Sequence, residues 1–359
     1  MSPNRLRRLR LLSVCAVLLT LAFTHAAGAV EPAYPKTHLR IIGNLANANQ
    51  YTNHEMPFWT RRIAERSGGQ VTAEISPFDQ SGILGRDMMR LLRLGVVQFG
   101  TTQLSNMVID APELGALDLP LLSPDFSSLR RTLTASRPFI QDHLRDHYDL
   151  KLLGIYAYPA QVLFCRNAFT DLASLAGRRI RTANVAQSEL VEALGATPIV
   201  TSFGEVVPSI RRGAVECAIT GTMSGNSAGL HEVTTHIHEL AITWGVAVFA
   251  ANGTAWRALP PAVAEFLRRE IAQLEAEILD AAERETDEGL ACNTGAPACA
   301  SGRKGRMVRV PTTPADADRI RSLIVGTVLP GWLGRCGDGC ISAWNTSLGP
   351  LLSIPAPRG

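Results

Sequence analysis

The sequence lacks the signatures of the common catalytic sites. It contains no H-E-x-x-H motif, no paired-acid motif, and no recognisable set of nucleophile, base and acid. It also lacks internal repeats and low-complexity tracts. Charged residues make up only 19% of the 359 residues, whereas 46% are hydrophobic, so the chain can bury a core and is not disordered. We therefore expect a globular protein that is not an enzyme, and keep a secreted enzyme only as the rival class.

No hydrophobic run in the sequence is long enough to span a membrane, which takes about 20 apolar residues. The run from Leu11 to Phe23 has thirteen residues, follows four arginines, and precedes the string AGA at 27–29. A positive n-region, a short apolar region and a small-x-small site are typical of a secretory signal peptide. We predict a signal peptide over residues 1–29, cleaved near Ala29, and a protein exported to the periplasm without insertion into the membrane.

The remaining chain has no excess of basic charge. Residues 1–29 hold four of the 35 basic residues and none of the 32 acidic ones, which leaves 31 basic residues and a net charge of −1. The formal charge of +3 therefore belongs to the export signal. A protein that binds nucleic acid needs a basic face, so we expect no nucleic-acid partner.

Six cysteines remain after cleavage, and none of them forms the C-x2-C spacing of a zinc site. In an oxidising compartment such cysteines are candidates for disulfides. The strings CNTGAPAC and CGDGC each place a pair across a turn that contains glycine. We predict the bridges Cys292–Cys299 and Cys336–Cys340. Pairing between the two clusters stays open, since six cysteines allow 15 connectivities.

Strand and helix patterns alternate in short units along the chain, which predicts an α/β fold with parallel sheets. The longest helix pattern starts after the Pro-Pro pair at 260–261 and carries acidic and basic residues on its exposed face. We expect helices at 51–67, 84–95, 172–175, 188–194, 203–213 and 261–289, and a loop at 292–305. We expect strands at 39–42, 70–76, 96–102, 151–158, 162–165, 179–182, 197–200, 214–220 and 240–251, the last one buried.

Three blocks of sequence carry a family resemblance. Residues 67–102 place a Gly-Gly turn, a strand, a proline and a Leu-Gly before a helix and a Phe-Gly strand. Residues 172–218 contain the strings GRRIR, LGATP and EVVPSIRRGAVECA, and residues 256–263 read WRALPPAV. Together they resemble the solute-binding proteins of tripartite ATP-independent periplasmic (TRAP) transporters, over roughly residues 38–311.

The resemblance implies a two-lobed periplasmic-binding-protein clamshell with a hinge and a long interdomain helix. We expect lobe I to comprise residues 30–157 and 266–311, and lobe II residues 158–265 and 312–359. It implies a receptor that binds a small organic acid between the lobes and delivers it to TRAP transporter membrane subunits. A sensing module for a membrane receptor is the alternative. The sequence leaves the identity of the acid and the oligomeric state open.

Three arginines, Arg178, Arg179 and Arg181, lie within four positions. Strand alternation puts Arg179 and Arg181 on one face but does not choose between them. The resemblance assigns the carboxylate to Arg181. A guanidinium offers a planar fork that matches a carboxylate bidentately and keeps its charge. We expect Arg178 and Arg179 to be solvated side chains at a strand edge.

Asn184, Phe203, Asn44 and Gln103 match positions at which the family contacts its ligand, although polar residues such as Asn44 and Gln103 are also common in loops. Thr220 follows the strand that contains Cys217, from which it can reach the cleft. Gln161 lies near a position where several relatives carry a second arginine, which implies a monocarboxylate or a ligand with a neutral distal group. An asparagine before a helix is also a common cap, and a phenylalanine is commonly core, so those readings stay open for Asn184 and Phe203. The candidate ligand-binding residues are Arg181, Asn184, Phe203, Asn44, Gln103, Gln161 and Thr220.

The sequence gives no reason to expect a cofactor or a metal site. His236 and His238 on a strand place two imidazoles on one face, but the spacing supplies no third ligand. We expect ordinary surface histidines here and at His231, although a metal that binds together with the ligand stays open.

Overall fold

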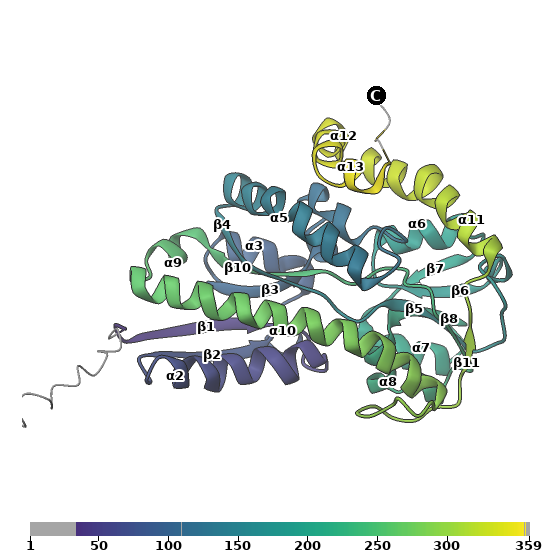
Figure 1. Ribbon diagram of the computed structural model, residues 1–359, viewed down its shortest axis with the longest axis horizontal. Helices are drawn as coiled ribbons and strands as arrows, with labels where there is room; N and C mark the ends of the chain where they lie inside the picture. The colour runs from purple at the N-terminus through teal and green to yellow at the C-terminus, as the bar shows by residue number, and fades with distance from the viewer. Residues whose placement is uncertain (1–33, 109, 355, 357–359) are drawn as a thin grey trace, which may run out of the picture.

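The computed structural model describes residues 34–108, 110–354 and 356, which form two lobes, each built on a mixed β-sheet (Figure 1). This confirms the two-lobed α/β fold. The predicted signal peptide lies outside the described residues. The first sheet has the strand order β2-β1-β3-β10-β4 and the second β11-β9-β5-β8-β6-β7. The strands are β1 (Thr37–Gly43), β2 (Val71–Pro77), β3 (Phe99–Gln103), β4 (Leu150–Tyr156), β5 (Gln161–Cys165), β6 (Arg179–Thr182), β7 (Thr197–Val200), β8 (Cys217–Gly221), β9 (His236–His238), β10 (Ala247–Asn252) and β11 (Val308–Val310).

Helices cover both faces of the sheets, and within the described residues none combines the length and apolarity needed to cross a membrane. The α-helices are α2 (Ile63–Arg66), α3 (Met88–Arg93), α4 (Leu104–Met107), α5 (Phe126–Tyr148), α6 (Val185–Ala193), α7 (Val206–Arg211), α8 (Thr222–Ala228), α9 (Gly253–Arg257), α10 (Pro261–Thr294), α11 (Pro314–Leu323), α12 (Leu329–Thr346) and α13 (Leu348–Leu352). The π-helical segments are η1 (Gln50–Glu55), η2 (Phe58–Arg62) and η9 (Ile324–Val328). The 3-10 turns are η3 (Phe78–Gln80), η4 (Gly85–Asp87), η5 (Pro112–Asp118), η6 (Ala173–Leu175), η7 (Phe203–Glu205) and η8 (Leu230–Glu232).

Strand β10 lies inside the first sheet and is buried along its whole length. Ala247, Phe249 and Ala251 pack in the core on the side of α10, whereas Val248 packs in the core shared with α5. Because both faces of this strand are covered, its sequence is a continuous apolar run rather than an alternating one.

The long helix α10 confirms the predicted interdomain helix and runs along both lobes (Figure 1). Its 34 residues correspond to a length of about 51 Å. Phe266, Ile271 and Ile278 pack against the first sheet, and further along the helix contacts α8 of the second lobe. The helix ends at Gly295, whose φ of 77° provides a left-handed cap. Helix α10 therefore continues five residues beyond the predicted end at Gly289, into the predicted loop.

Two crossings between the lobes are hydrogen-bonded to each other, and they form the hinge. Residues 157–160 connect β4 to β5, and residues 239–246 connect β9 to β10. Tyr158 N donates to Trp244 O (3.0 Å), and Gln161 N donates to Thr243 O (2.8 Å). In return, Ile242 N donates to Gln161 O (2.8 Å). The predicted strand over 240–251 is therefore correct only for its second half, since its first half belongs to this crossing.

The expectation of parallel sheets is correct only in part, since β1 pairs parallel with β2 and β3, and β6 with β7 and β8. Strand β10 pairs antiparallel with β3 and β4, and β5 pairs antiparallel with β8 and β9. A chain that crosses between lobes re-enters each sheet in the opposite direction. The lobe boundaries stay a prediction, but two strands lie in the other sheet: β10 belongs to the first and β11 to the second. The predicted helix at 51–67 consists of the π-helical segments η1 and η2 followed by α2.

Three disulfides lie within the described residues. The predicted bridges Cys292–Cys299 and Cys336–Cys340 are both confirmed. The third joins Cys165 of β5 to Cys217 of β8, which face each other in the antiparallel pair. The sequence did not indicate this pairing, because the register of two strands 52 residues apart is visible only in the folded sheet.

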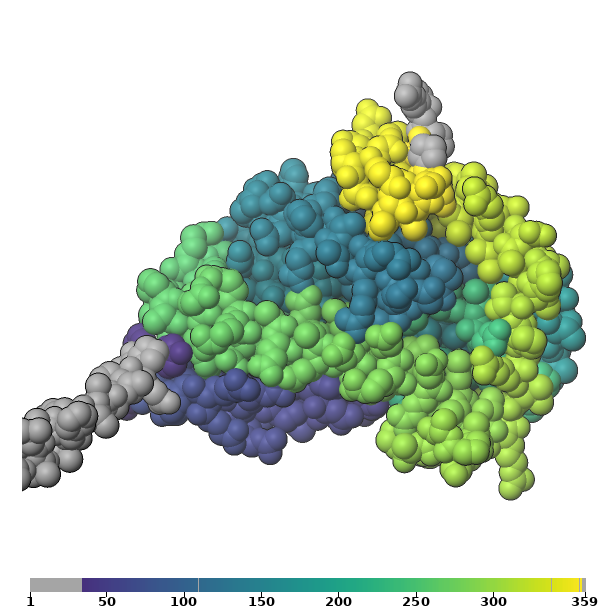
Figure 2. All heavy atoms as spheres, viewed as in Figure 1, coloured from purple at the N-terminus to yellow at the C-terminus, as the bar shows by residue number. Residues whose placement is uncertain are grey.

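The C-terminal helices lie against both lobes, and Figure 2 shows them as a ridge on the surface above α5. Trp332 Nε1 of α12 donates to Pro112 O of η5 (2.8 Å), and Arg335 of the same helix pairs with Glu189 of α6. Trp332 is fully buried. This segment therefore connects the first lobe to the second on the outside of the molecule.

Candidate functional site

A cleft of about 500 Å³ lies between the two lobes. It forms where the carboxyl ends of β1, β2 and β3 face those of β6, β7 and β8. This is the edge at which open α/β sheets bind their ligands, and the volume is in the range of about 300–1,000 Å³ typical of ligand pockets. The lining residues are Leu45, Asn47, Ala48, Phe78, Asp79, Ile83, Leu84, Gly85, Gln103, Asn106, Tyr158, Gln161, Arg181, Ala183, Thr201, Ser202, Phe203, Gly204, Thr220, Gly221 and Ser224.

Arg181 lines this cleft from the second lobe and is only 4% exposed. Its Nε and Nη2 donate to Thr201 O (3.0 and 2.7 Å), and its Nη1 donates to Ile219 O (2.9 Å). A guanidinium has five N–H donors. Three of them are used by these carbonyl groups, which leaves one N–H on each terminal nitrogen for a ligand. The carbonyl group of Thr201, after β7, and that of Ile219, in β8, thus fix the fork in place.

The charge of Arg181 is not balanced by an acidic side chain of the described residues. Burial lowers the pKa of Arg181 to about 10, and no carboxylate opposes that effect. The group therefore still carries its charge at neutral pH. A buried charge without an opposite charge is costly, so the two remaining N–H groups of this guanidinium can accept an anion.

The cleft brings together five of the seven candidate residues: Arg181, Gln103, Gln161, Phe203 and Thr220. Gln103 ends β3 in the first lobe, and the other four come from the second lobe or its border. They are far apart in the sequence, so the shared wall was predicted only through the family resemblance.

Gln161 has a defined hydrogen-bond pattern at the hinge. Its Oε1 accepts from Gln187 Nε2 (2.8 Å), and the same Gln187 nitrogen donates to Thr243 Oγ1 (2.9 Å). The amide side chain of Gln161 carries no net charge. This position therefore adds polarity to the cleft wall but no charge.

Asn44 does not line the cleft but lies directly behind it. Its Oδ1 accepts from the hydroxyl of Tyr158, which does line the cleft, and from Leu45 N (2.9 Å). Its backbone N–H donates to Glu55 Oε2 (2.7 Å), and Thr101 Oγ1 donates to the other oxygen of this carboxyl. Burial raises the pKa of Glu55 to about 7, against the effect of these two hydrogen bonds. Asn44 therefore supports the wall through Tyr158.

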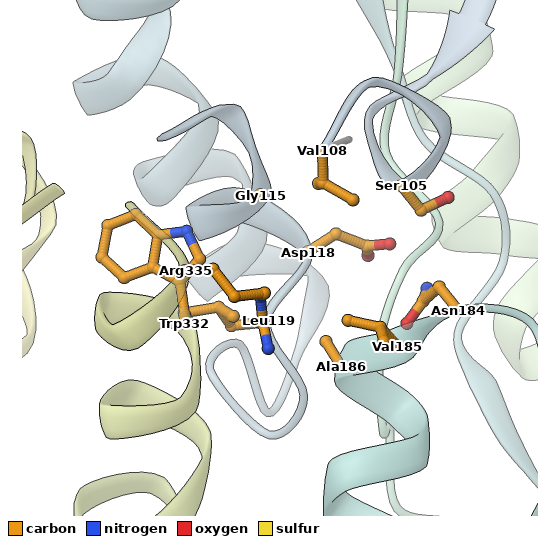
Figure 3. Close-up of a pocket in the computed structure, with 10 residues that line it drawn as sticks. All are labelled: Ser105, Val108, Gly115, Asp118, Leu119, Asn184, Val185, Ala186, Trp332 and Arg335. Atoms are coloured by element: carbon orange, nitrogen blue, oxygen red, sulfur yellow. The ribbon is translucent and has the colours of Figure 1, made fainter. Parts of the chain in front are cut away.

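Asn184 caps a helix, as the alternative interpretation held. Its Oδ1 accepts from Gln187 N (2.9 Å) at the start of α6. Its side chain borders a second cavity of only about 20 Å³, shown in Figure 3. Asp118 and Arg335 border the same small cavity, which has room for about one water molecule.

Arg178 and Arg179 lie outside the cleft and bind loop carbonyl groups. Arg178 donates to the carbonyl oxygens of Asn167, Ala168 and Ser174. Arg179 is exposed and donates to the carbonyl oxygens of residues 213 and 214. The prediction of solvated side chains is therefore correct in placing both outside the site, but both also hold loops of the second lobe.

One serine motif was missed in the sequence. Residues 225–229 read GNSAG and match G-x-S-x-G. In that motif the serine occupies a sharp turn between a strand and a helix. Ser227 instead lies near the end of α8, is exposed, and does not line the cleft. The match therefore has no catalytic geometry.

The three histidines considered for metal binding do not form a metal cluster. No group of three or more His, Cys, Asp or Glu side chains within the described ranges is placed to hold a metal ion. His238 is fully buried, not at the surface as expected, and its Nδ1 accepts from Leu240 N (2.9 Å). Burial lowers the pKa of His238, against the opposing charge of Asp316.

Two groups of cleft residues were not predicted from the sequence. Tyr158 was assigned to the end of a strand, with no role. The large apolar side chains Leu45, Phe78, Ile83 and Leu84 lie in loops that follow β1 and β2. The sequence signal that could have identified them is the presence of large apolar residues in loops, because such side chains are usually buried in the core.

Two mixed α/β lobes are joined by paired crossings, and the cleft between them contains the buried guanidinium of Arg181. This architecture is that of the periplasmic solute-binding proteins. The chain belongs to the bacterial extracellular solute-binding proteins of family 7 (DctP), which match residues 42–292. Solved members of this fold include solute-binding proteins of TRAP transporters.

Three relatives illustrate the similarity. A solute-binding protein of Sulfitobacter sp. (strain NAS-14.1) is 24% identical over 225 residues, which cover 62% of this chain and 64% of the relative. The chain thus matches less than two thirds of that relative's length. A Bordetella pertussis solute receptor that binds pyroglutamic acid has a TM-score of 0.75 at 19% identity, over 86% of this chain and 98% of the other. A Desulfovibrio salexigens TRAP protein with bound orotic acid has a TM-score of 0.74 at 16% identity, over 88% and 97%.

Proposed function

We propose that the protein is an extracytoplasmic solute receptor that binds a small organic carboxylate in the interlobe cleft. It delivers this ligand to the membrane subunits of a TRAP transporter and works in the periplasm after removal of its signal peptide. The observation that carries the proposal is Arg181, a buried cation in the cleft with no acidic partner among the described residues. The acids bound by the two structural relatives, pyroglutamic and orotic acid, are both carboxylic acids.

In this proposal, the carboxylate accepts hydrogen bonds from the two free N–H groups of Arg181. Gln103, Gln161, Phe203 and Thr220 contact the rest of the ligand, because they line the same cleft. Asn44 acts through Tyr158, and Asn184 acts by starting α6. Contacts to both lobes let the ligand favour the closed state, since a ligand shifts an equilibrium only through different affinities for its two states.

The test is a thermal-shift screen of organic acids followed by calorimetry on Arg181 variants. Arg181→Ala should weaken binding of the acid with the largest shift by roughly 2–5 kcal/mol, as expected for removing one partner of a buried charge pair. Arg181→Lys keeps the charge without the fork and should lose part of the affinity.

Arg179→Ala is the matched control, because Arg179 lies on the same strand but outside the cleft, and it should bind as the native protein does. The circular dichroism spectra should be unchanged. Full affinity in Arg181→Ala would exclude the carboxylate site.

A further inference from the structure

The cleft has only one positive charge. Among the described residues that line it, Arg181 is the only Lys, Arg or His, and Asp79 is the only Asp or Glu. A ligand with two carboxylates would therefore bring a second negative charge into a closing cleft without a cation to receive it. Desolvating an unpaired carboxylate is unfavourable, and the penalty grows as water leaves.

The two walls of the cleft differ in chemistry. The second lobe contributes Arg181 and the hydroxyl groups of Thr201, Ser202, Thr220 and Ser224. The first lobe contributes the large apolar side chains Leu45, Phe78, Ile83 and Leu84, together with polar side chains such as Asn47, Gln103 and Asn106, and Phe203 adds one apolar side chain on the second lobe. Phe78 and Ile83 are partly buried against the core, whereas Leu84 is 52% exposed at the rim. A ligand held by its carboxylate at Arg181 thus meets an apolar surface on the opposite lobe.

Asp79 lies on that same wall and is already engaged. Its Oδ1 accepts from Ala46 N (3.0 Å), and the side chain is exposed to solvent. A second carboxylate on this wall would meet a like charge. The amide of Gln161 adds a neutral polar group and no cation.

We infer that the ligand is a monocarboxylate with an uncharged, largely apolar body, whose carboxylate binds Arg181 and whose body packs against Leu45, Phe78, Ile83 and Leu84. This inference rests on the proposed function and narrows its ligand class. When the lobes close, the apolar wall and the apolar body of the ligand are buried against each other. This burial stabilises the contact between the ligand and the first lobe.

Four six-carbon acids test the inference by calorimetry on the full mature chain. Hexanoate has an apolar body, adipate a second carboxylate, gluconate a body of hydroxyl groups, and 6-aminohexanoate a distal ammonium. We expect hexanoate to bind at least tenfold more tightly than each of the other three. Tighter binding of adipate, gluconate or 6-aminohexanoate would overturn the inference, and each result identifies which property of the body is wrong.

A charge placed on the apolar wall gives a second, independent readout. Leu84→Arg should raise the affinity for adipate relative to hexanoate at least tenfold, because the new guanidinium faces the distal carboxylate. Leu84 is half-exposed, so the substitution is compatible with folding. Leu94→Arg is the matched control, since Leu94 is 63% exposed at the end of α3 and does not line the cleft. An unchanged preference in Leu84→Arg would count against the assignment of this wall to the body.

The inference and the proposed function fail in different ways. If the acid screen yields a diacid or a sugar acid whose binding requires Arg181, the function stands and the apolar monocarboxylate is wrong. If no acid binds through Arg181, both are wrong.

Discussion

At the scale of single residues, buried ionisable groups of this protein differ in whether they carry charge. Arg181 keeps its charge in the cleft, whereas Glu55 and Asp118 are carboxyl groups whose pKa burial raises to about 7. Asp118 accepts hydrogen bonds from the backbone N–H groups of Gly245 (2.9 Å) and Trp244 (3.3 Å), at one of the interlobe crossings. The two hydrogen bonds of Asp118 therefore connect η5 to the crossing at residues 239–246.

The raised pKa of Asp118 predicts a dependence of stability on pH. The ordinary value of 3.8 applies in the unfolded chain, so between about pH 4 and pH 7 the folded state holds a proton that the unfolded state has lost. The contribution of this group is therefore most favourable below pH 4 and declines as the pH rises to 7. Each pKa unit corresponds to about 1.4 kcal/mol.

Asp118→Asn should make the free energy of unfolding fall less between pH 5 and pH 8 than it does in the native protein. The amide oxygen can still accept from Gly245 N. Urea unfolding at several pH values measures this, and Glu55 keeps its own contribution in both proteins. A slope as steep as that of the native protein would show that Asp118 titrates normally.

Some of the residues at the site could be predicted from the sequence, and others could not. Arg181 was predictable because it lies near the end of β6, within a run that matches a known family. Cys165 and Cys217, Tyr158 and the apolar wall were not, because their roles depend on which strand lies beside which. Asn184 was correctly recognised as a possible cap because capping depends on local sequence alone.

At the scale of elements, Gly289 allows the backbone of α10 to lie close to the backbone of α8. A Cβ on Gly289 would lie 2.5 Å from the carbonyl carbon of Thr222, and closer still to the amide nitrogen of Met223. Both are backbone atoms, so neither can move aside without shifting α8. Gly289 therefore lets the two backbones pack directly.

Gly289→Ala should destabilise the protein by about 1–3 kcal/mol, since overpacking outweighs the better helix propensity of alanine. Gly334→Ala in α12 is the matched control, because its new methyl group meets no atom within 4 Å. It should stabilise the protein by about 0.5–1 kcal/mol. Urea unfolding of both variants gives the comparison, and equal effects would mean that the close approach of α10 is not maintained.

Element positions were largely predictable, whereas pairing was not. Strands β6 and β7 begin and end as expected: β6 reads RIRT and alternates polar and apolar residues, and β7 reads TPIV and is rich in β-branched residues. The antiparallel entry of β10 and β5 depends on the path of the chain between lobes, which no local pattern encodes.

At the scale of the whole molecule, three segments join the lobes on different sides. The paired crossings lie at the hinge, α10 runs along both lobes, and α12 contacts η5 and α6. Any closure must bend the crossings and let the contacts of α10 and α12 slide or move with one lobe.

Closure predicts a smaller radius of gyration in the presence of ligand. Small-angle scattering of the native protein with the acid found in the screen should show this decrease. Arg181→Ala at the same acid concentration should scatter like the free native protein, which separates closure from a general effect of the acid. Identical curves for the free and bound native protein would contradict a hinged clamshell.

The order of the cysteines along the chain has a consequence for biogenesis. Each of the six cysteines among the described residues bonds with its next neighbour in sequence: Cys165 with Cys217, Cys292 with Cys299, and Cys336 with Cys340. Of the 15 connectivities available to six thiols, this is the one in which every bond joins successive cysteines. On the route of export that we propose, bonds formed in the order in which the thiols emerge therefore give the native set.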